Sequence, residues 1–155
     1  MGIVIREAKY SDLPFLVANN LAMAVEAEGI NLDSAILEMG VCAVFDDRTR
    51  GVYLIAEVDG TPAGSLLITK EWSDWRCCWY MWIQSVYVLP QFRRQGVYTT
   101  LYKRVLECAE KHNASAVRLY VERENVNAIR VYEKLGMSKS HYDLYEIDTS
   151  KHIEE

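Results

Sequence analysis

Residues 83–103 read IQSVYVLPQFRRQGVYTTLYK, and this stretch decides how the chain is organised. The apolar run from Ile83 to Leu89 predicts a buried strand, which ends at Pro90 because proline cannot donate to a sheet ladder. A basic loop follows, and Gly96 opens a helix. Such a loop leaves backbone N–H groups unpaired at the positive end of the helix. The stretch therefore predicts an anion site, although a connector without a ligand would have the same pattern.

The helix after Gly96 is predicted by the spacing of its apolar residues. They repeat every three or four positions and so share one face, at Val97, Leu101, Val105, Cys108 and Ala109. Charged residues occupy the opposite, solvated face, at Lys103, Arg104, Glu107 and Glu110.

A second motif follows later in the chain and has the spacing N-x-x-A-x-x-x-Y-x-x-x-G, at Asn125, Ala128, Tyr132 and Gly136. Together with Arg93 and Gly96 of the first stretch, it resembles the GNAT superfamily of acyl-CoA-dependent N-acetyltransferases. The resemblance covers nearly the whole chain. It departs from the family at Tyr98, where a small residue is usual, so the Tyr98 ring is expected to turn away from the phosphates.

The resemblance implies acetyl-CoA as co-substrate, with its pyrophosphate at the helix start and its pantetheine along a splayed central strand. The backbone N–H of Val86 is implied to be the oxyanion donor, and Tyr132 the general acid. A core tyrosine on a helical stripe would have the same pattern as Tyr132, and Asn125 is expected to cap its helix, contact the coenzyme, or both. The implied coenzyme contacts are Val86, Tyr87, Val88, Arg93, Arg94, Gln95, Gly96, Val97, Tyr98, Thr99, Asn125 and Tyr132.

Length and composition predict one globular domain over residues 1–148, with a polar tail over 149–155. The formal net charge of −5 argues against a nucleic-acid partner, and the chain has no apolar run long enough for a membrane span. Its four cysteines form no C-x-x-C pair. We therefore expect no metal, reduced thiols and a cytoplasmic location.

The order of elements predicts an α/β fold, with a mixed sheet and helices on both faces, as β-α-α-β-β-β-α-β-α-β. Ser11 or Asp12 is expected to cap the first helix, which Gly29 ends. Asp33 or Ser34 is expected to cap the second, with Ile36, Met39 and Ala43 facing inward. Asp59-Gly60 predicts a hairpin turn, and alternation over 141–147 predicts the last strand.

The acceptor is expected to be a small-molecule amine. Glu26 and Glu28, at the joint between the first two helices, are candidates for holding it, although glutamates at a helix end are usually just solvated. All four tryptophans fall within residues 71–84, at Trp72, Trp75, Trp79 and Trp82. They could pack on the sheet, form the interface of a homodimer, or line the acceptor pocket, with Trp82 as the pocket candidate.

The general base is the least defined part of the site. Many family members place a carboxylate on the central strand, where this chain has Gln84 and Ser85. Either these two residues hold a water chain, or a glutamate such as Glu26, Glu28 or Glu122 acts, or the amine arrives with a low pKa. The sequence thus predicts direct attack in a ternary complex, and the alternative is a catalytically silent acyl-CoA-binding module.

Overall fold

The computed structural model describes residues 2–150, and the chain divides into two compact units, Met1–Glu122 and Arg123–Glu155. The helices and strands of the first unit are β1 (Ile3–Glu7), α1 (Leu13–Glu28), α2 (Ser34–Asp46), β2 (Val52–Val58), β3 (Thr61–Ser73), β4 (Cys78–Val88), α3 (Val97–Lys111) and β5 (Ala114–Leu119). The second unit contains α4 (Val126–Lys134).

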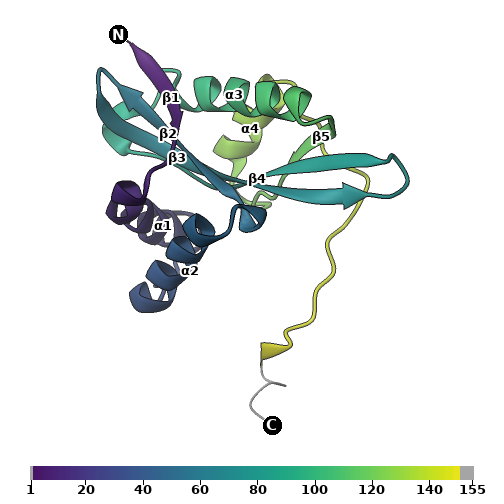
Figure 1. The fold of residues 1–155 in the computed structure, drawn as a ribbon, viewed down its shortest axis with the longest axis horizontal. Helices are drawn as coiled ribbons and strands as arrows, with labels where there is room; N and C mark the ends of the chain where they lie inside the picture. Colours follow the sequence, from purple (N-terminus) through teal and green to yellow (C-terminus); the bar gives the residue numbers. More distant parts are fainter. Residues whose placement is uncertain (1, 151–155) are drawn as a thin grey trace. The chain divides into compact units, whose positions relative to one another are not determined.

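The sheet of the first unit has the strand order β1-β2-β3-β4-β5 (Figure 1). The first four strands pair antiparallel, and β5 pairs parallel to β4. Short turns connect the antiparallel neighbours in this part of the sheet. Asp59-Gly60 joins β2 to β3, and residues 74–77 join β3 to β4. A parallel pair needs a longer crossover, which α3 supplies.

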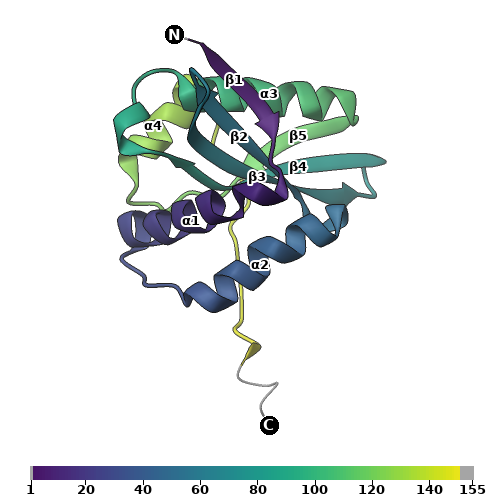
Figure 2. The same cartoon turned by 60° about the vertical axis from the view of Figure 1, so that its left-hand side comes forward.

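Helices α1 and α2 cover one face of this sheet (Figure 2). A buried core cluster joins them to the strands, with members Leu16, Val41, Tyr53, Ile55 and Leu67. Side chains alternate between the faces of a strand, so Ser65 lies on this face too, and Asn19 Nδ2 of α1 donates to its hydroxyl at 2.8 Å. This buried hydrogen bond between α1 and β3 follows from no pattern in the sequence.

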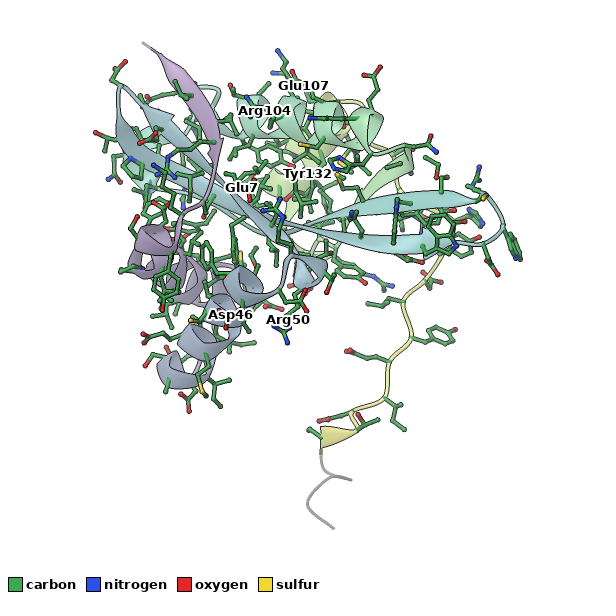
Figure 3. All side chains as sticks on the ribbon, in the orientation of Figure 1. Glu7, Asp46, Arg50, Arg104, Glu107 and Tyr132 are labelled. Atoms are coloured by element: carbon green, nitrogen blue, oxygen red, sulfur yellow. The ribbon has the colours of Figure 1, made fainter. Side chains whose placement is uncertain are left out.

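Helix α3 covers the opposite face with the apolar side predicted for it. Val97, Leu101 and Val105 are buried, and Gly64 of β3 lies beneath Val97. On its outer side Arg104 and Glu107 form an ion pair at 3.4 Å (Figure 3). The predicted mixed sheet with helices on both faces is therefore confirmed.

Two predictions for α1 and α2 need correction. Asp12 occupies the N-cap position of α1 but does not cap it, because its carboxylate binds both terminal nitrogens of Arg6, at 2.7 and 2.9 Å. Ile36 and Met39 of α2 are exposed rather than inward, and Val41 is the buried residue. Since α2 is apolar around most of its circumference, the spacing could not show which face packs on the sheet.

The tryptophan hairpin is the exposed end of β3 and β4. Trp72 packs edge to face on Trp79 across the strands at 4.9 Å, yet Trp72 and Trp75 are 51% and 91% exposed. Trp72 therefore packs on the sheet through Trp79 while about half of it stays exposed, whereas Trp75 does not pack on the sheet. Trp79 and Trp82 are half-buried on opposite faces of β4, as their alternation predicts.

In the second unit, residues 141–147 form no strand, and the predicted last strand is wrong. Alternating apolar residues favour an extended chain, but a strand exists only when its backbone pairs with another, and this segment pairs with no described strand. Leu144 and Tyr145 are accordingly exposed. Most of the predicted tail, 149–155, lies outside the described residues. No helix within residues 2–150 has the length and apolarity needed to cross a bilayer.

Candidate active site

Strand β4 carries a β-bulge near its end. Gln84 pairs with Leu67 of β3, but the next pair in this direction is Tyr87 with Ser65, so two residues of β4 oppose one of β3. Ser85, within the bulge, has a φ of 52°, which is uncommon for a residue with a side chain. A bulge bends its strand and interrupts the ladder of hydrogen bonds. The end of β4 is therefore bent away from the line of its first part.

The bulge coincides with the point where β5 leaves β4. The last pair between the two strands is Ile83 with Leu119, whereas β4 continues to Val88. Residues 84–88 therefore have β3 on one side and no β5 partner on the other. Main-chain N–H and C=O groups on this side are able to bind an extended ligand in the way that a further strand would. The predicted splay of the central strand is present.

The loop after β4 leads to the start of α3. Arg94 has a φ of 61°, and Gly96, the N-cap of α3, has a φ of 84°, both in the left-handed region. The first amides of an α-helix have no acceptor within the helix, and Gly96 has no side chain that could supply one. The start of this 15-residue helix therefore suits a diphosphate. The open edge of β4 suits the pantetheine amides of coenzyme A, and the amides at the start of α3 suit its diphosphate.

Three loop and helix residues of the predicted coenzyme site are exposed or half-buried near this start. Arg94 and Gln95 are exposed, and Gln95 Nε2 donates to the carbonyl of Gln91 at 3.0 Å. Thr99 is half-buried in the first turn. The ring of Tyr98 lies 6.2 Å from that of Tyr102, one turn further along the helix. This placement agrees with a ring directed away from the helix start.

Arg93 is held by groups of the protein itself. Its Nε donates to the carbonyl of Val88 at 2.9 Å, and a terminal nitrogen binds Glu26 at 2.9 Å. The other oxygen of Glu26 accepts a hydrogen bond from the hydroxyl of Tyr87, with 2.8 Å between the two oxygens. These hydrogen bonds, that of Tyr87 first, lower the pKa of Glu26, whereas burial raises the pKa of Tyr87. No pattern in the sequence indicates this cluster, because Glu26 is 61 residues from Tyr87 and 67 residues from Arg93 along the chain.

The other predicted acceptor-side residues come from α1 and β4. Glu28 is exposed at the last position of α1. Gln84 lies on the face of β4 covered by α1 and α2, and its amide donates to Thr69 Oγ1 at 2.8 Å. Trp82, on the same face, donates its indole N–H to Glu71 at 2.9 Å. The contact of Trp82 with Glu71 is a second one that the sequence did not suggest.

The second unit carries the remaining predicted residues on α4. The Asn125 side chain accepts the backbone N–H of Ala128 at 3.2 Å, so its predicted capping role is confirmed. Tyr132 lies on the same helix (Figure 3) and is half-buried. Burial raises the pKa of its phenol, which keeps the hydroxyl protonated at neutral pH. Its role beside the coenzyme stays a prediction.

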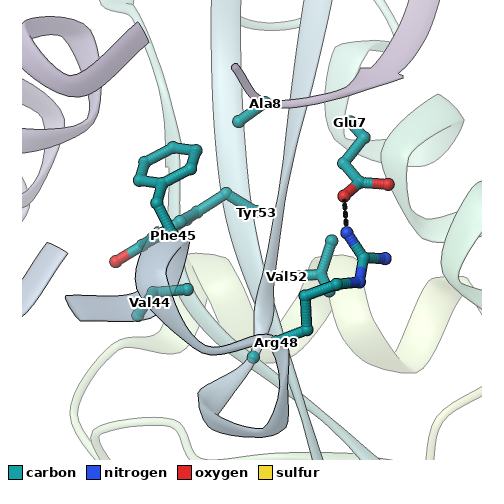
Figure 4. Close-up of a pocket in the computed structure, with 8 residues that line it drawn as sticks. Glu7, Ala8, Val44, Phe45, Arg48, Val52 and Tyr53 are labelled. Carbon is teal, nitrogen blue, oxygen red and sulfur yellow. Dashed lines mark hydrogen bonds and ion pairs between the residues drawn. The ribbon is translucent and has the colours of Figure 1, made fainter. Parts of the chain in front are cut away.

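A small cavity of about 40 Å³ lies elsewhere in the first unit, between α2, β1 and β2 (Figure 4). Phe45 and Tyr53 line one side, and the ion pair of Arg48 with Glu7 lines the other. Sites for drug-sized ligands are typically about 300 Å³ or larger, so this cavity is too small for a coenzyme or an acceptor. The open edge of β4 is the better candidate site.

Comparison with known proteins agrees with this geometry. The model of the acetyltransferase (GNAT) family matches residues 26–137. A thialysine N-epsilon-acetyltransferase of Mus musculus is 38% identical over 141 residues, which cover 85% of this chain and 82% of that protein. The chain spans about half the length of the first three curated relatives, with matches that cover 41%, 58% and 55% of their lengths.

Solved structures show the same fold. The structure of a possible acetyltransferase from Clostridium difficile 630 has a TM-score of 0.88 and 39% identity, covering 94% of this chain and 97% of that one. The structure of a predicted acetyltransferase with acetyl-CoA from Clostridium acetobutylicum has a TM-score of 0.77 at 19% identity, covering 97% and 99%. The match of the family model and the similarity to the mouse protein lead to one conclusion: the chain belongs to the GNAT family of acetyltransferases.

Proposed function

We propose that this protein is an acetyl-CoA-dependent N-acetyltransferase that acetylates a primary amine of a small molecule. One observation carries the proposal: β4 bulges and parts from β5 immediately before the amides at the start of α3. The family supplies acetyl-CoA as the co-substrate that fits this arrangement. Relatives from Caenorhabditis elegans, Mus musculus, Sus scrofa and Bos taurus are named thialysine N-epsilon-acetyltransferases. Amino acids with a side-chain amine are therefore the first acceptors to test.

The reaction joins the amine nitrogen to the acetyl carbon and breaks the bond from that carbon to sulfur. The backbone N–H of Val86, beside the bulge, is the proposed donor to the carbonyl oxygen as negative charge develops on it. Tyr132 is the proposed donor of a proton to the departing thiolate, and its raised pKa suits a group that must be protonated beforehand. No covalent intermediate on the protein is required. Cys108, on the packed side of α3, has a pKa raised by burial, which disfavours a thiolate nucleophile.

The amine must lose a proton before or during attack. Gln84 and Ser85 cannot accept it, so we propose that they hold water that carries it to solvent. The Gln84 amide nitrogen already donates to Thr69, which fixes the side chain and leaves its carbonyl oxygen as an acceptor for water. A cytoplasmic location and a homodimer stay predictions.

The alternative function is a silent acyl-CoA-binding module, which the lack of a carboxylate at positions 84 and 85 favours. Both functions require coenzyme binding, so turnover distinguishes them. The test measures release of free thiol from acetyl-CoA with a panel of lysine-like amino acids, diamines and monoamines. Enzyme activity predicts amine-dependent thiol release that Tyr132→Phe suppresses. Tight coenzyme binding without stimulation by any amine would support the silent module instead.

A further inference from the structure

The carboxylate of Glu26 connects three parts of the candidate site. Glu26 lies in the last turn of α1, where one oxygen accepts the Tyr87 hydroxyl at 2.8 Å and the other binds Arg93 at 2.9 Å. Arg93 also donates its Nε hydrogen to the carbonyl of Val88, and its guanidinium lies 5.3 Å from the centre of the Tyr87 ring. One charged cluster thus ties the end of α1 to the end of β4 and to the loop before α3.

These contacts leave Arg93 poorly suited to bind a phosphate. Two sides of its guanidinium already make hydrogen bonds to oxygen, one of them to a carboxylate that balances its charge. Turning toward a diphosphate would break both bonds and leave the Glu26 carboxylate beside Tyr87 without its cation. Arg94 differs, since it is exposed and pairs with no carboxylate among residues 2–150. Arg94 also lies one position closer than Arg93 to the helix start at Gly96.

We propose that Glu26 is a positioning residue that holds Arg93 against the end of β4, and that Arg94 and the amides at the start of α3 bind the coenzyme's diphosphate. The proposal rests on the function proposed above. It assigns the two neighbouring arginines different tasks, although the family motif would place both against the coenzyme. It also removes Glu26 from the candidates for holding the acceptor amine, because Arg93 already balances the charge of its carboxylate.

The test compares the variants Glu26→Gln, Arg93→Gln and Arg94→Gln and the double variant of Glu26 and Arg93. Glu110→Gln is the matched control, since Glu110 is an exposed glutamate near the far end of α3. Calorimetry gives the Kd for coenzyme A at two salt concentrations, and thiol release gives KM and kcat for acetyl-CoA and for the amine. The variants are first compared by circular dichroism to verify folding.

We expect Arg94→Gln to raise the Kd for coenzyme A about tenfold or more and to reduce its salt dependence, because a charge-assisted contact is lost. Arg93→Gln is expected to change this Kd less than about threefold, within the cost of one neutral hydrogen bond. Three variants, Glu26→Gln, Arg93→Gln and the double variant, each break the ion pair between Glu26 and Arg93. We therefore expect all three to lower kcat/KM for the amine by the same factor. Glu110→Gln should match the wild type.

Two results would overturn the proposal. One is a loss of coenzyme affinity in Arg93→Gln as large as that in Arg94→Gln, which would make Arg93 a phosphate ligand. The other is a rise in the amine KM for Glu26→Gln with none for Arg93→Gln, which would make Glu26 an amine-binding residue. If the wild type binds coenzyme A but acetylates no amine, the proposed function fails, while the coenzyme affinities still decide the assignment of the arginines.

Discussion

Gly64 is the position where a single methyl group should disturb the candidate site most directly. It lies on β3 opposite Val88, under the end of β4 and the start of α3. A Cβ at this position would lie 3.0 Å from the carbonyl oxygen of Tyr87 and 3.3 Å from side-chain atoms of Val88 and Val97. The carbonyl belongs to the backbone, and branched valines have little rotamer freedom. Gly64→Ala must therefore displace the strand end, the helix start, or both.

We expect Gly64→Ala to lower the free energy of unfolding by about 1 to 3 kcal/mol, the usual cost of overpacking a core. For a chain of this length that corresponds to a decrease in Tm of about 2 to 12 °C. The displaced segments carry the proposed coenzyme contacts, so if about 1.4 kcal/mol of the cost falls on the bound geometry, the Kd for coenzyme A rises about tenfold. Chemical denaturation and isothermal titration calorimetry measure the two effects.

Gly40→Ala provides the matched control. Gly40 lies within α2, and no atom lies within 4 Å of the position of an added Cβ. Alanine there should raise the free energy of unfolding by up to about 1 kcal/mol, because it favours the helix over the unfolded chain. Coenzyme affinity should not change. If Gly64→Ala is as stable as the wild type and binds coenzyme A equally well, the close packing of β3 against the site is contradicted.

Three further substitutions test separate parts of the account. Tyr132→Phe should lower kcat at least about 100-fold, the lower range for a lost general acid, with the Kd for coenzyme A unchanged; an unchanged kcat would exclude the role of the phenol. Gly96→Ala should cost about 1 to 2 kcal/mol, because its φ of 84° strains any other residue, and should weaken coenzyme binding measured by calorimetry; equal affinity would remove the helix start from the site. Asp12→Asn should lower the free energy of unfolding by about 1 to 3 kcal/mol at pH 7. The bond from Arg6 lowers the pKa of Asp12 below 3.8, so this stabilisation is present above that pH and disappears as pH falls through the folded pKa; denaturation at pH 7 and pH 3 should therefore show the gap between wild type and variant closing in acid.

Much of the fold could be predicted because it depends on local patterns. The strand before Pro90, the helix after Gly96 and the turn at Asp59-Gly60 follow from residues close together in sequence, and the structure contains all three. Asp33 caps α2 and Gly29 ends α1 with a φ of 65°, as their residue types predict. Each of these features is decided by the chemistry of one residue and its immediate neighbours.

The incorrect predictions concern features that depend on distant partners. Asp12 is a suitable cap by residue type, but its carboxylate binds the guanidinium of Arg6 and does not cap α1. Residues 141–147 alternate as a strand does, yet no described strand pairs with them. The same limit explains why Glu26 was predicted only as a candidate for the amine. Its bonds to Tyr87 and Arg93 join residues that only the folded chain brings together.

The central claim is that the amides at the start of α3 and the open edge of β4 bind one molecule of coenzyme A. A crystal structure of the protein with acetyl-CoA tests it most directly. We expect the diphosphate within hydrogen-bonding distance of the backbone nitrogens of residues 94–99, with the pantetheine amides paired to the backbone of residues 84–88. A coenzyme bound elsewhere, or bound here only through side chains with these amides turned away, would contradict it.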